Sequence, residues 1–105
     1  MARVQRTQTA ERSLDEIFDH VGRKNHSPAA AAQLLRRIAW KCELYATQPL
    51  MGEARPDLGP DVRCFPVGNF IVFYQPLEDG ILVLVVLHGA RDIPQLFRDS
   101  FGDRV

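Results

Sequence analysis

Apolar residues recur at helical spacing in the segment between residues 9 and 24. Four of them follow at i, i+3, i+4 and i+7, which places them on one face of an α-helix. They are Leu14, Ile17, Phe18 and Val21. Thr9 can accept a hydrogen bond from the first turn, and Glu11 complements the positive end of the helix dipole. The segment therefore predicts an amphipathic helix with Thr9 as its N-cap.

A second helical pattern starts at Ser27-Pro28, because serine is a good N-cap and proline is tolerated at the first helical position. The pattern runs to about Thr47, and Pro49 stops it. Its expected buried side consists of Ala31, Leu34 or Leu35, Ile38, Cys42 and Tyr45. Because the link between the two helices is short, we expect them to fold back on each other as an antiparallel hairpin.

Turn residues and apolar segments alternate in the second half of the chain. Residues 48–61 hold three prolines and two glycines and predict a loop. Gly68-Asn69 and Asp79-Gly80 suit tight turns between the apolar segments that follow. We expect these segments to form an antiparallel meander of three strands, Val62–Pro66, Asn69–Leu77 and Ile81–His88.

Each end of the chain adds one short element. Arg3–Thr7 alternates polar and apolar residues and predicts an edge strand. Residues 93–101, IPQLFRDSF, place Ile93, Leu96 and Phe97 on one face of a short helix. The 105 residues suit one domain, residues 1–105. The predicted fold class is α+β: an N-terminal edge strand, an antiparallel helix hairpin, a three-stranded antiparallel meander and a short C-terminal helix.

The last two strands are apolar on both faces, whereas a sheet with one wet face alternates polar and apolar residues. Under strict alternation, Phe70, Val72 and Tyr74 oppose Ile71 and Phe73. By the same rule, Val83, Val85 and Leu87 oppose Leu82, Leu84 and Val86. The helix hairpin can cover only one face. We therefore expect a partner chain to cover much of the other; the alternative is that the C-terminal segment and the 48–61 loop suffice.

Composition and charge narrow the classes of function. The chain carries 13 basic and 13 acidic residues, so it lacks the broad positive field of a general nucleic-acid binder. No segment reaches the roughly 18 apolar residues of a membrane span, and the first 13 residues lack the apolar core of a signal peptide. Cys42 and Cys64 show no CxxC spacing, and we interpret them as two small buried side chains in a reducing cytoplasm.

Four segments of the chain, in order, resemble the ParE branch of the ParE/RelE superfamily, the toxins of bacterial type II toxin–antitoxin systems. They are Leu14–Phe18, Tyr45–Gly52 followed by Arg55 and Val62-Arg63, Gly68–Tyr74, and Val86–Asp92 with its closing HGARD. The resemblance spans nearly the full length. It implies the same fold that the periodicity predicts, and an antitoxin that lies across the open face of the sheet.

An antitoxin on that face is expected to contact apolar strand residues and two arginines at the rim. These residues are Phe70, Val72, Tyr74, Val83, Val85, Arg55 and Arg91. The resemblance further implies a cytoplasmic hetero-oligomer that meets DNA only through the antitoxin. It implies no membrane partner, no cofactor and no metal.

The superfamily has two activities, which the residues help to separate. RelE-like members are ribosome-dependent mRNA endonucleases, whereas ParE-like members poison DNA gyrase. RNA cleavage needs an acid, a base and cations around the phosphate, and binding the ribosome favours a basic surface. The chain has only two lysines, and its candidates for cleavage are Arg63, His88 and Arg91. We expect a gyrase inhibitor without catalytic residues. The alternatives are an endonuclease that uses these three residues and a non-toxic co-regulator that binds the antitoxin.

The polar turn at the end of the last strand is predicted to have a structural role first. Gly89 allows a sharp exit from the strand. Asp92 can cap the last helix, and Arg91 can pair with a carboxylate or contact a partner. We therefore expect this turn to end the strand and cap the helix rather than to catalyse.

Overall fold

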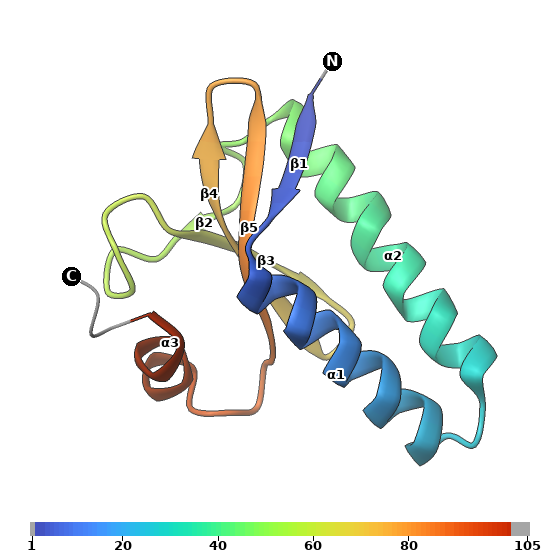
Figure 1. Cartoon of the computed structure of the whole chain (residues 1–105). Coiled ribbons are helices and arrows are strands. Elements are labelled where there is room, and N and C mark those ends of the chain that lie inside the picture. Colours follow the sequence, from blue (N-terminus) through green and yellow to red (C-terminus); the bar gives the residue numbers. More distant parts are fainter. Residues whose placement is uncertain (1, 102–105) are drawn as a thin grey trace.

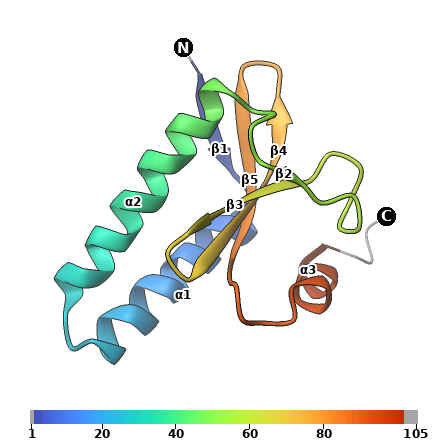
Figure 2. The same ribbon diagram turned by 180° about the vertical axis from the view of Figure 1, so that it is seen from behind.

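The protein is built around a mixed five-stranded sheet. The computed structural model describes residues 2–101. The strand order is β1-β5-β4-β3-β2 (Figure 1). The strands are β1 (Arg3–Arg6), β2 (Glu53–Ala54), β3 (Arg63–Val67), β4 (Phe70–Leu77) and β5 (Gly80–His88). The helices are α1 (Gln8–Lys24), α2 (Pro28–Thr47) and α3 (Ile93–Phe101). Figures 1 and 2 show α1 and α2 on one side of the sheet and α3 on the other.

The predicted α+β fold and its order of elements are confirmed. The N-terminal strand β1 is an edge strand, and it runs parallel to β5 with Val4 opposite Ile81. One element was not predicted. Strand β2 lies inside the expected loop and pairs Glu53 with Cys64. A strand of two residues leaves no periodicity in the sequence, so the hydrophobic pattern could not indicate it.

The predicted N-cap is correct for α2 and wrong for α1. Ser27 caps α2 by accepting a hydrogen bond from Ala30 N at 3.2 Å. The prediction of Thr9 as the cap of α1 is wrong, because Thr9 already lies in the first helical turn. Thr7 is the cap. Its Oγ1 accepts from Ala10 N at 3.0 Å and donates to Leu84 O at 2.7 Å, which also ties the start of the helix to β5.

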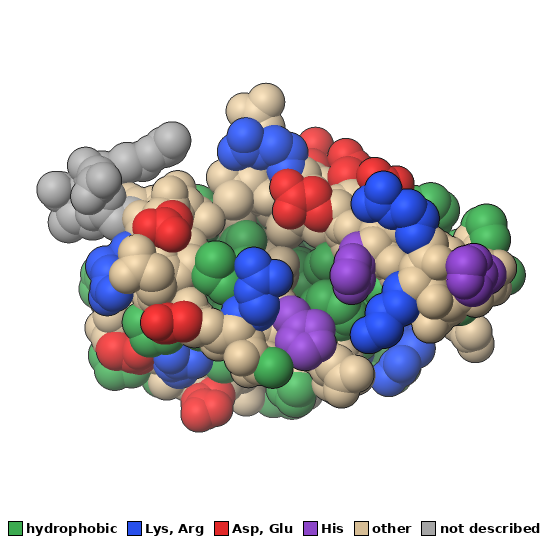
Figure 3. All heavy atoms as spheres, turned by 90° about the horizontal axis from the view of Figure 1, so that it is seen from below, with side chains coloured by type: hydrophobic (Ala, Val, Ile, Leu, Met, Phe, Trp, Pro, Cys, Tyr) green, Lys and Arg blue, Asp and Glu red, His purple; other side chains and the backbone are tan. Residues whose placement is uncertain are grey.

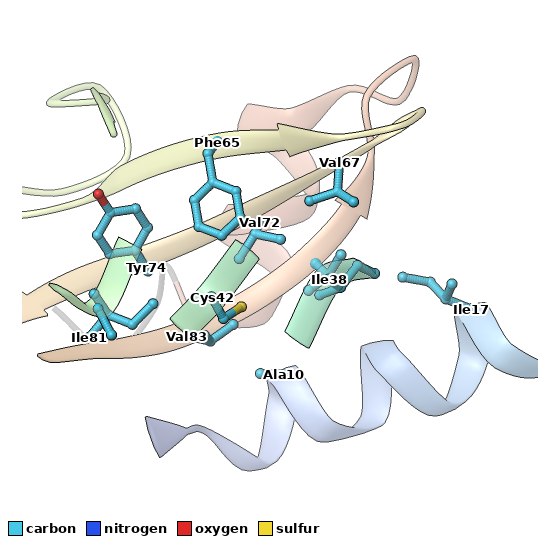
Figure 4. Packing of buried hydrophobic residues seen from close by; sticks show 12 residues of the cluster. Ala10, Ile17, Ile38, Cys42, Phe65, Val67, Val72, Tyr74, Ile81 and Val83 are labelled. Carbon is cyan, nitrogen blue, oxygen red and sulfur yellow. The ribbon is translucent and has the colours of Figure 1, made fainter. Parts of the chain in front are cut away.

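The helix hairpin packs on one face of the sheet. Figure 4 shows Phe65, Val72 and Tyr74 pointing from the strands toward the helices. Tyr45 of α2 stacks on Phe65 with ring centroids 4.0 Å apart and an interplanar angle of 11°. An offset aromatic stack adds about 0.5–1.5 kcal/mol to the burial of the two rings. This contact fixes α2 over β3.

A β-bulge interrupts the alternation of β5. The register shifts between Phe73 and Tyr74, where Phe73 pairs with Val85 but Tyr74 pairs with Val83. Leu84 is therefore the extra residue, and Leu84 and Val85 both face away from the hairpin. The strict alternation predicted for β5 is wrong beyond this point. Val85 and Leu87 lie on the second face with Leu82 and Leu84, whereas Val86 lies under the hairpin.

The second face is covered by segments of the chain itself. Ile93, Phe97 and Phe101 of α3 pack there, together with Leu58 and Val62 of the loop before β3. The centre of this face is closed, since Phe73 is 0% exposed and Val85 is 2% exposed. The expectation that a partner chain covers much of this face is wrong for the described residues. A nine-residue helix with two phenylalanines, added to the loop, supplies enough apolar surface.

The cysteines are the two small buried side chains that the sequence predicts. Cys42 of α2 lies in the core between the hairpin and the sheet, Cys64 lies on the second face, and both are free and buried. Burial raises the pKa of the Cys42 thiol to about 11 and raises that of Cys64. Among residues 2–101, no helix combines the length and the apolar character needed to cross a membrane.

Because α3 covers the second face, two neighbouring substitutions in this helix should destabilise the protein to different extents. Phe97 is buried and meets the Phe73 ring edge-on at a centroid distance of 5.8 Å, whereas Leu96 is only half-buried. We expect Phe97→Ala to lower the free energy of unfolding by about 3 kcal/mol, and Leu96→Ala by about 1 kcal/mol. Urea denaturation measures both. Equal small losses would mean that α3 does not seal the sheet.

Candidate functional site

An open cleft of about 790 Å³ lies between α1, the C-terminal end of β5 and α3. Its side chains come from three walls. Thr9, Arg12, Ser13, Glu16, Ile17 and His20 form the α1 wall; Phe70, Val85, Val86, Leu87, His88, Ala90 and Arg91 come from the sheet and its exit; Leu96, Asp99 and Ser100 form the α3 wall. Figure 3 shows apolar side chains in a hollow on this side of the molecule, with histidine and Lys or Arg side chains beside it.

Hydrogen bonds to the backbone of β5 position the α1 wall. Ser13 is buried, and its Oγ donates to Ala10 O at 2.8 Å and accepts from Val86 N at 3.1 Å. This bond replaces a ladder bond at the point where α1 crosses the strand. The buried serine therefore fixes the depth of the cleft, because it sets how closely α1 approaches β5.

The turn Gly89–Asp92 shapes the other end of the cleft. Gly89 N donates to Asn69 O at 2.8 Å, and Ala90 N donates to His88 Nδ1 at 3.1 Å. Asp92 Oδ1 accepts from Gln95 N at 3.3 Å at the start of α3, so the predicted cap is present. The imidazole of His88 meets the Phe70 ring edge-on at 5.3 Å. One nitrogen of His88 is thus occupied by the turn itself.

The charged side chains of the cleft are not paired with one another. Arg12, Glu16, Arg91 and Asp99 all line it, and within residues 2–101 none of them has an oppositely charged group within 4.0 Å. The Asp99 carboxylate accepts a hydrogen bond from Gln95 Nε2 at 2.9 Å. Charges of both signs around a mostly apolar floor suit a polypeptide segment better than a simple anion.

The seven residues predicted to contact an antitoxin do not form one surface. Phe70, Val85 and Arg91 line the cleft, as does His88. Val72, Tyr74 and Val83 lie in the core beneath the hairpin and are fully buried. The sequence grouped these three with Phe70 and Val85 because all five belong to apolar strands. In the structure, the helix hairpin covers the first three, and the bulge places Val85 on the second face.

Arg55, the seventh of these residues, lies in the loop that covers the second face. Its Nε and Nη2 donate to Asp57 Oδ1 and Oδ2 at 3.1 and 3.0 Å, and its guanidinium lies 5.8 Å from the centre of the Phe73 ring. The side-chain hydrogen bonds raise the pKa of Arg55 and lower the pKa of Asp57. The guanidinium of Arg55 is therefore engaged within its own loop.

Arg63 and Tyr74 hold the turn that follows α2. Arg63 Nη1 donates to the carbonyl oxygens of Leu50 and Gly52 at 3.0 and 2.8 Å. The Tyr74 hydroxyl donates to Pro49 O at 2.7 Å and accepts from Gly52 N at 3.0 Å. Four hydrogen bonds thus fix one short turn. Both side chains have a structural role there.

The three candidates for RNA cleavage do not meet at one place. His88 and Arg91 line the cleft. Arg63 pairs with Tyr74 across the β3–β4 ladder, whereas His88 pairs with Phe70 across β4–β5. Four residues of β4 separate these positions, which is about 13 Å at 3.3 Å per residue. A single phosphate group cannot contact both ends.

Sequence reasoning did not find the α1 and α3 walls of the cleft. Thr9, Arg12, Glu16 and His20 recur at i, i+3, i+7 and i+11, so their spacing marked one edge of α1. The spacing does not say what that edge faces. Only the position of α3 across the sheet shows that this edge borders a cleft.

Comparisons with known proteins define the class of this fold and then the family. The chain superposes on a solved structure described as the chromosomal ParDE TA system from P. aeruginosa, with a TM-score of 0.69. The match covers 84% of this chain and 96% of that one at 22% identity, which shows a shared fold. Toxin ParE3 of Caulobacter vibrioides is 32% identical over 93 residues, 89% of this chain and 92% of that protein.

Residues 4–93 match the family described as the ParE toxin of type II toxin-antitoxin system, parDE. The chain therefore belongs to the ParE toxin family. This confirms the resemblance seen in the four sequence segments, and with it the assignment to a type II toxin–antitoxin system.

The different roles of two arginines give a prediction for stability. Arg63→Ala removes two hydrogen bonds from a charged donor to the turn, and we expect it to lower the free energy of unfolding by about 1–2 kcal/mol. Arg91 is exposed and has no ion-pair partner within residues 2–101. Arg91→Ala should therefore change the free energy of unfolding by less than about 0.5 kcal/mol. Urea denaturation compares the two. A larger loss for Arg91→Ala would give that side chain a structural role.

Proposed function

We propose that this member of the ParE toxin family inhibits DNA gyrase and is neutralised by binding its cognate antitoxin in the cytoplasm. Membership of the family carries the proposal, since it implies an antitoxin partner. The separation of Arg63 from His88 and Arg91 also supports it, because cleavage of RNA needs its catalytic groups at one phosphate. On this account the chain acts by binding other proteins and not by bond-breaking chemistry.

The cleft is the proposed entry point for a segment of the antitoxin. Of the residues expected to contact the antitoxin, Phe70 and Arg91 are accessible there. Arg91 can form a bidentate pair with a carboxylate of the partner. The ring of Phe70, which packs edge-on against His88 in the same cleft, offers an apolar contact.

An mRNA endonuclease is the second candidate, and one observation favours it. His88 and Arg91 lie in the same cleft, so an acid–base group and a cation are available near one site. A purely regulatory, non-toxic protein that binds only the antitoxin is the third candidate.

Expression in a bacterial host, combined with two assays on purified protein, tests the proposal. We expect induced expression to stop growth and to trigger the DNA-damage response. Co-expression of the cognate antitoxin, whose small reading frame we expect adjacent to this gene, should restore growth. Purified chain should block supercoiling by gyrase and leave mRNA intact in a translating extract. The reason is that the cleft holds only part of a cleavage site.

Two results would contradict the proposal. Codon-specific mRNA cuts that disappear in His88→Ala would support the endonuclease. Normal growth on full induction, with the protein folded and abundant, would support the non-toxic co-regulator.

A further inference from the structure

The outward side of α2 exposes two large apolar residues that the fold does not use. Trp40 is 63% exposed and Leu44 is 40% exposed. Ile38 and Cys42, two residues before and after Trp40, are buried in the core. Residues two apart on an α-helix point in nearly opposite directions, so Trp40 faces directly away from the sheet. Figures 1 and 2 show α2 along the outside of the molecule, with no other element over it.

The turn that directly follows α2 exposes two more large apolar residues. Leu50 is 70% exposed and Met51 is 45% exposed. Their turn is held by the four hydrogen bonds from Arg63 and Tyr74. The two side chains are therefore presented on a fixed backbone, and their exposure does not come from a loose loop.

The charge around Trp40 is positive. The segment from Arg36 to Leu44 carries three basic side chains and one acidic one. Arg36 and Arg37 lie one turn before Trp40, and within residues 2–101 neither has an acidic group within 4.0 Å. We name Arg36, Arg37, Trp40, Leu44, Leu50 and Met51 together the α2 face.

The composition of the α2 face matches the centre of a protein interface. Trp, Met and Arg are enriched at such centres, and Trp and Arg are enriched among the residues that carry most of the binding energy. Of the five large hydrophobic side chains exposed within residues 2–101, four belong to this face. The fifth, Phe18, lies on α1 among Asp15, Glu16 and Asp19.

A tightly bound partner needs more apolar contact than the cleft provides. A stable interface buries roughly 800 Å² on each partner. The cleft floor is already largely inaccessible, since Val85 and Val86 are both buried. Within residues 2–101, the α2 face is a second place where large apolar side chains are exposed to a partner.

We propose that the α2 face docks a segment of the antitoxin in which acidic side chains flank an apolar cluster. This inference rests on the proposed neutralisation by an antitoxin and names the surface that carries it. Trp40 supplies the central apolar contact. Arg36 and Arg37 pair with the acidic side chains and speed association.

Affinity measurements with matched variants test the inference. The probe is the purified product of the adjacent reading frame, titrated calorimetrically into wild-type chain, Trp40→Ala, and the double variant Arg36→Glu with Arg37→Glu. We expect about 30-fold weaker binding for Trp40→Ala and about 10-fold weaker binding for the double variant. Phe18→Ala, an exposed aromatic outside the face, should change affinity less than about threefold.

Two controls keep the result interpretable. Each substituted side chain is exposed, so circular dichroism and urea midpoints should match the wild type. The double variant should also lose most of the dependence of affinity on salt between low and high NaCl, because it removes the charges that attract the partner.

The chain contains a single tryptophan, which reports on the face directly. We expect acrylamide quenching of Trp40 fluorescence to fall sharply when the antitoxin binds, with any antitoxin tryptophan replaced by phenylalanine. A complex with undiminished quenching and equal affinities for all variants would overturn the inference and leave the neutralisation intact.

The remaining outcomes are also decisive. If the wild-type chain neither binds nor is neutralised by the adjacent product, the proposed neutralisation and this inference fail together. If Trp40→Ala and the double variant instead abolish a dimer seen by light scattering, the face belongs to a second copy. If they abolish binding to DNA, it belongs to nucleic acid. If they abolish binding to gyrase alone, it belongs to the target. Each of these three results overturns the antitoxin assignment.

Discussion

Strand β5 is apolar on both faces, and most of the molecule is arranged to keep those two faces from water. The helix hairpin buries one set of side chains, including Ile81, Val83 and Val86. Because of the bulge at Leu84, Leu84 and Val85 both lie on the second face, where α3 and the loop before β3 cover them. Leaving such side chains exposed would cost roughly 1.5–3 kcal/mol each, and the nine-residue helix α3 avoids this cost by packing on the second face. The cleft lies at the C-terminal end of β5, where side chains of α1 from one covering layer and of α3 from the other line it.

Much of this fold could be predicted from the sequence because its signals are local. The helical stripes, the Ser27 cap, the turn residues and the apolar runs each fix one element, and all of those elements are present. The features that the sequence pattern could not predict depend on contacts between segments far apart in the chain. Thr7 caps α1 because its hydroxyl also reaches Leu84 in β5. The bulge at Leu84, opposite Phe73 and Tyr74, leaves no signal in two continuous apolar strands, and it places Val85 on the second face.

The candidate site shows the same limit. The sequence marked His88, Arg91 and Phe70, which do line one cleft. It also grouped Phe70 and Arg91 with Val72, Tyr74 and Val83, which are core residues. Apolar strand residues look alike whether a helix of the same chain or a partner covers them. The α2 face had no signal of its own, since an exposed tryptophan can be recognised only once the buried side of the helix is known. Membership of the ParE toxin family gives these surfaces their functional meaning.

The most direct test of this account uses the two cysteines, because one lies under each layer. Cys42 of α2 is buried between the hairpin and the sheet. Cys64 is buried on the face that α3 and the loop cover. The measurement is the rate at which each thiol of the native, free chain reacts with a thiol-specific reagent, with the sites resolved by mass spectrometry. If the chain closes both faces of its own sheet, both thiols react slowly and at rates limited by unfolding. Rapid labelling of Cys64 with Cys42 still protected would show that the second face is open to water and awaits a partner.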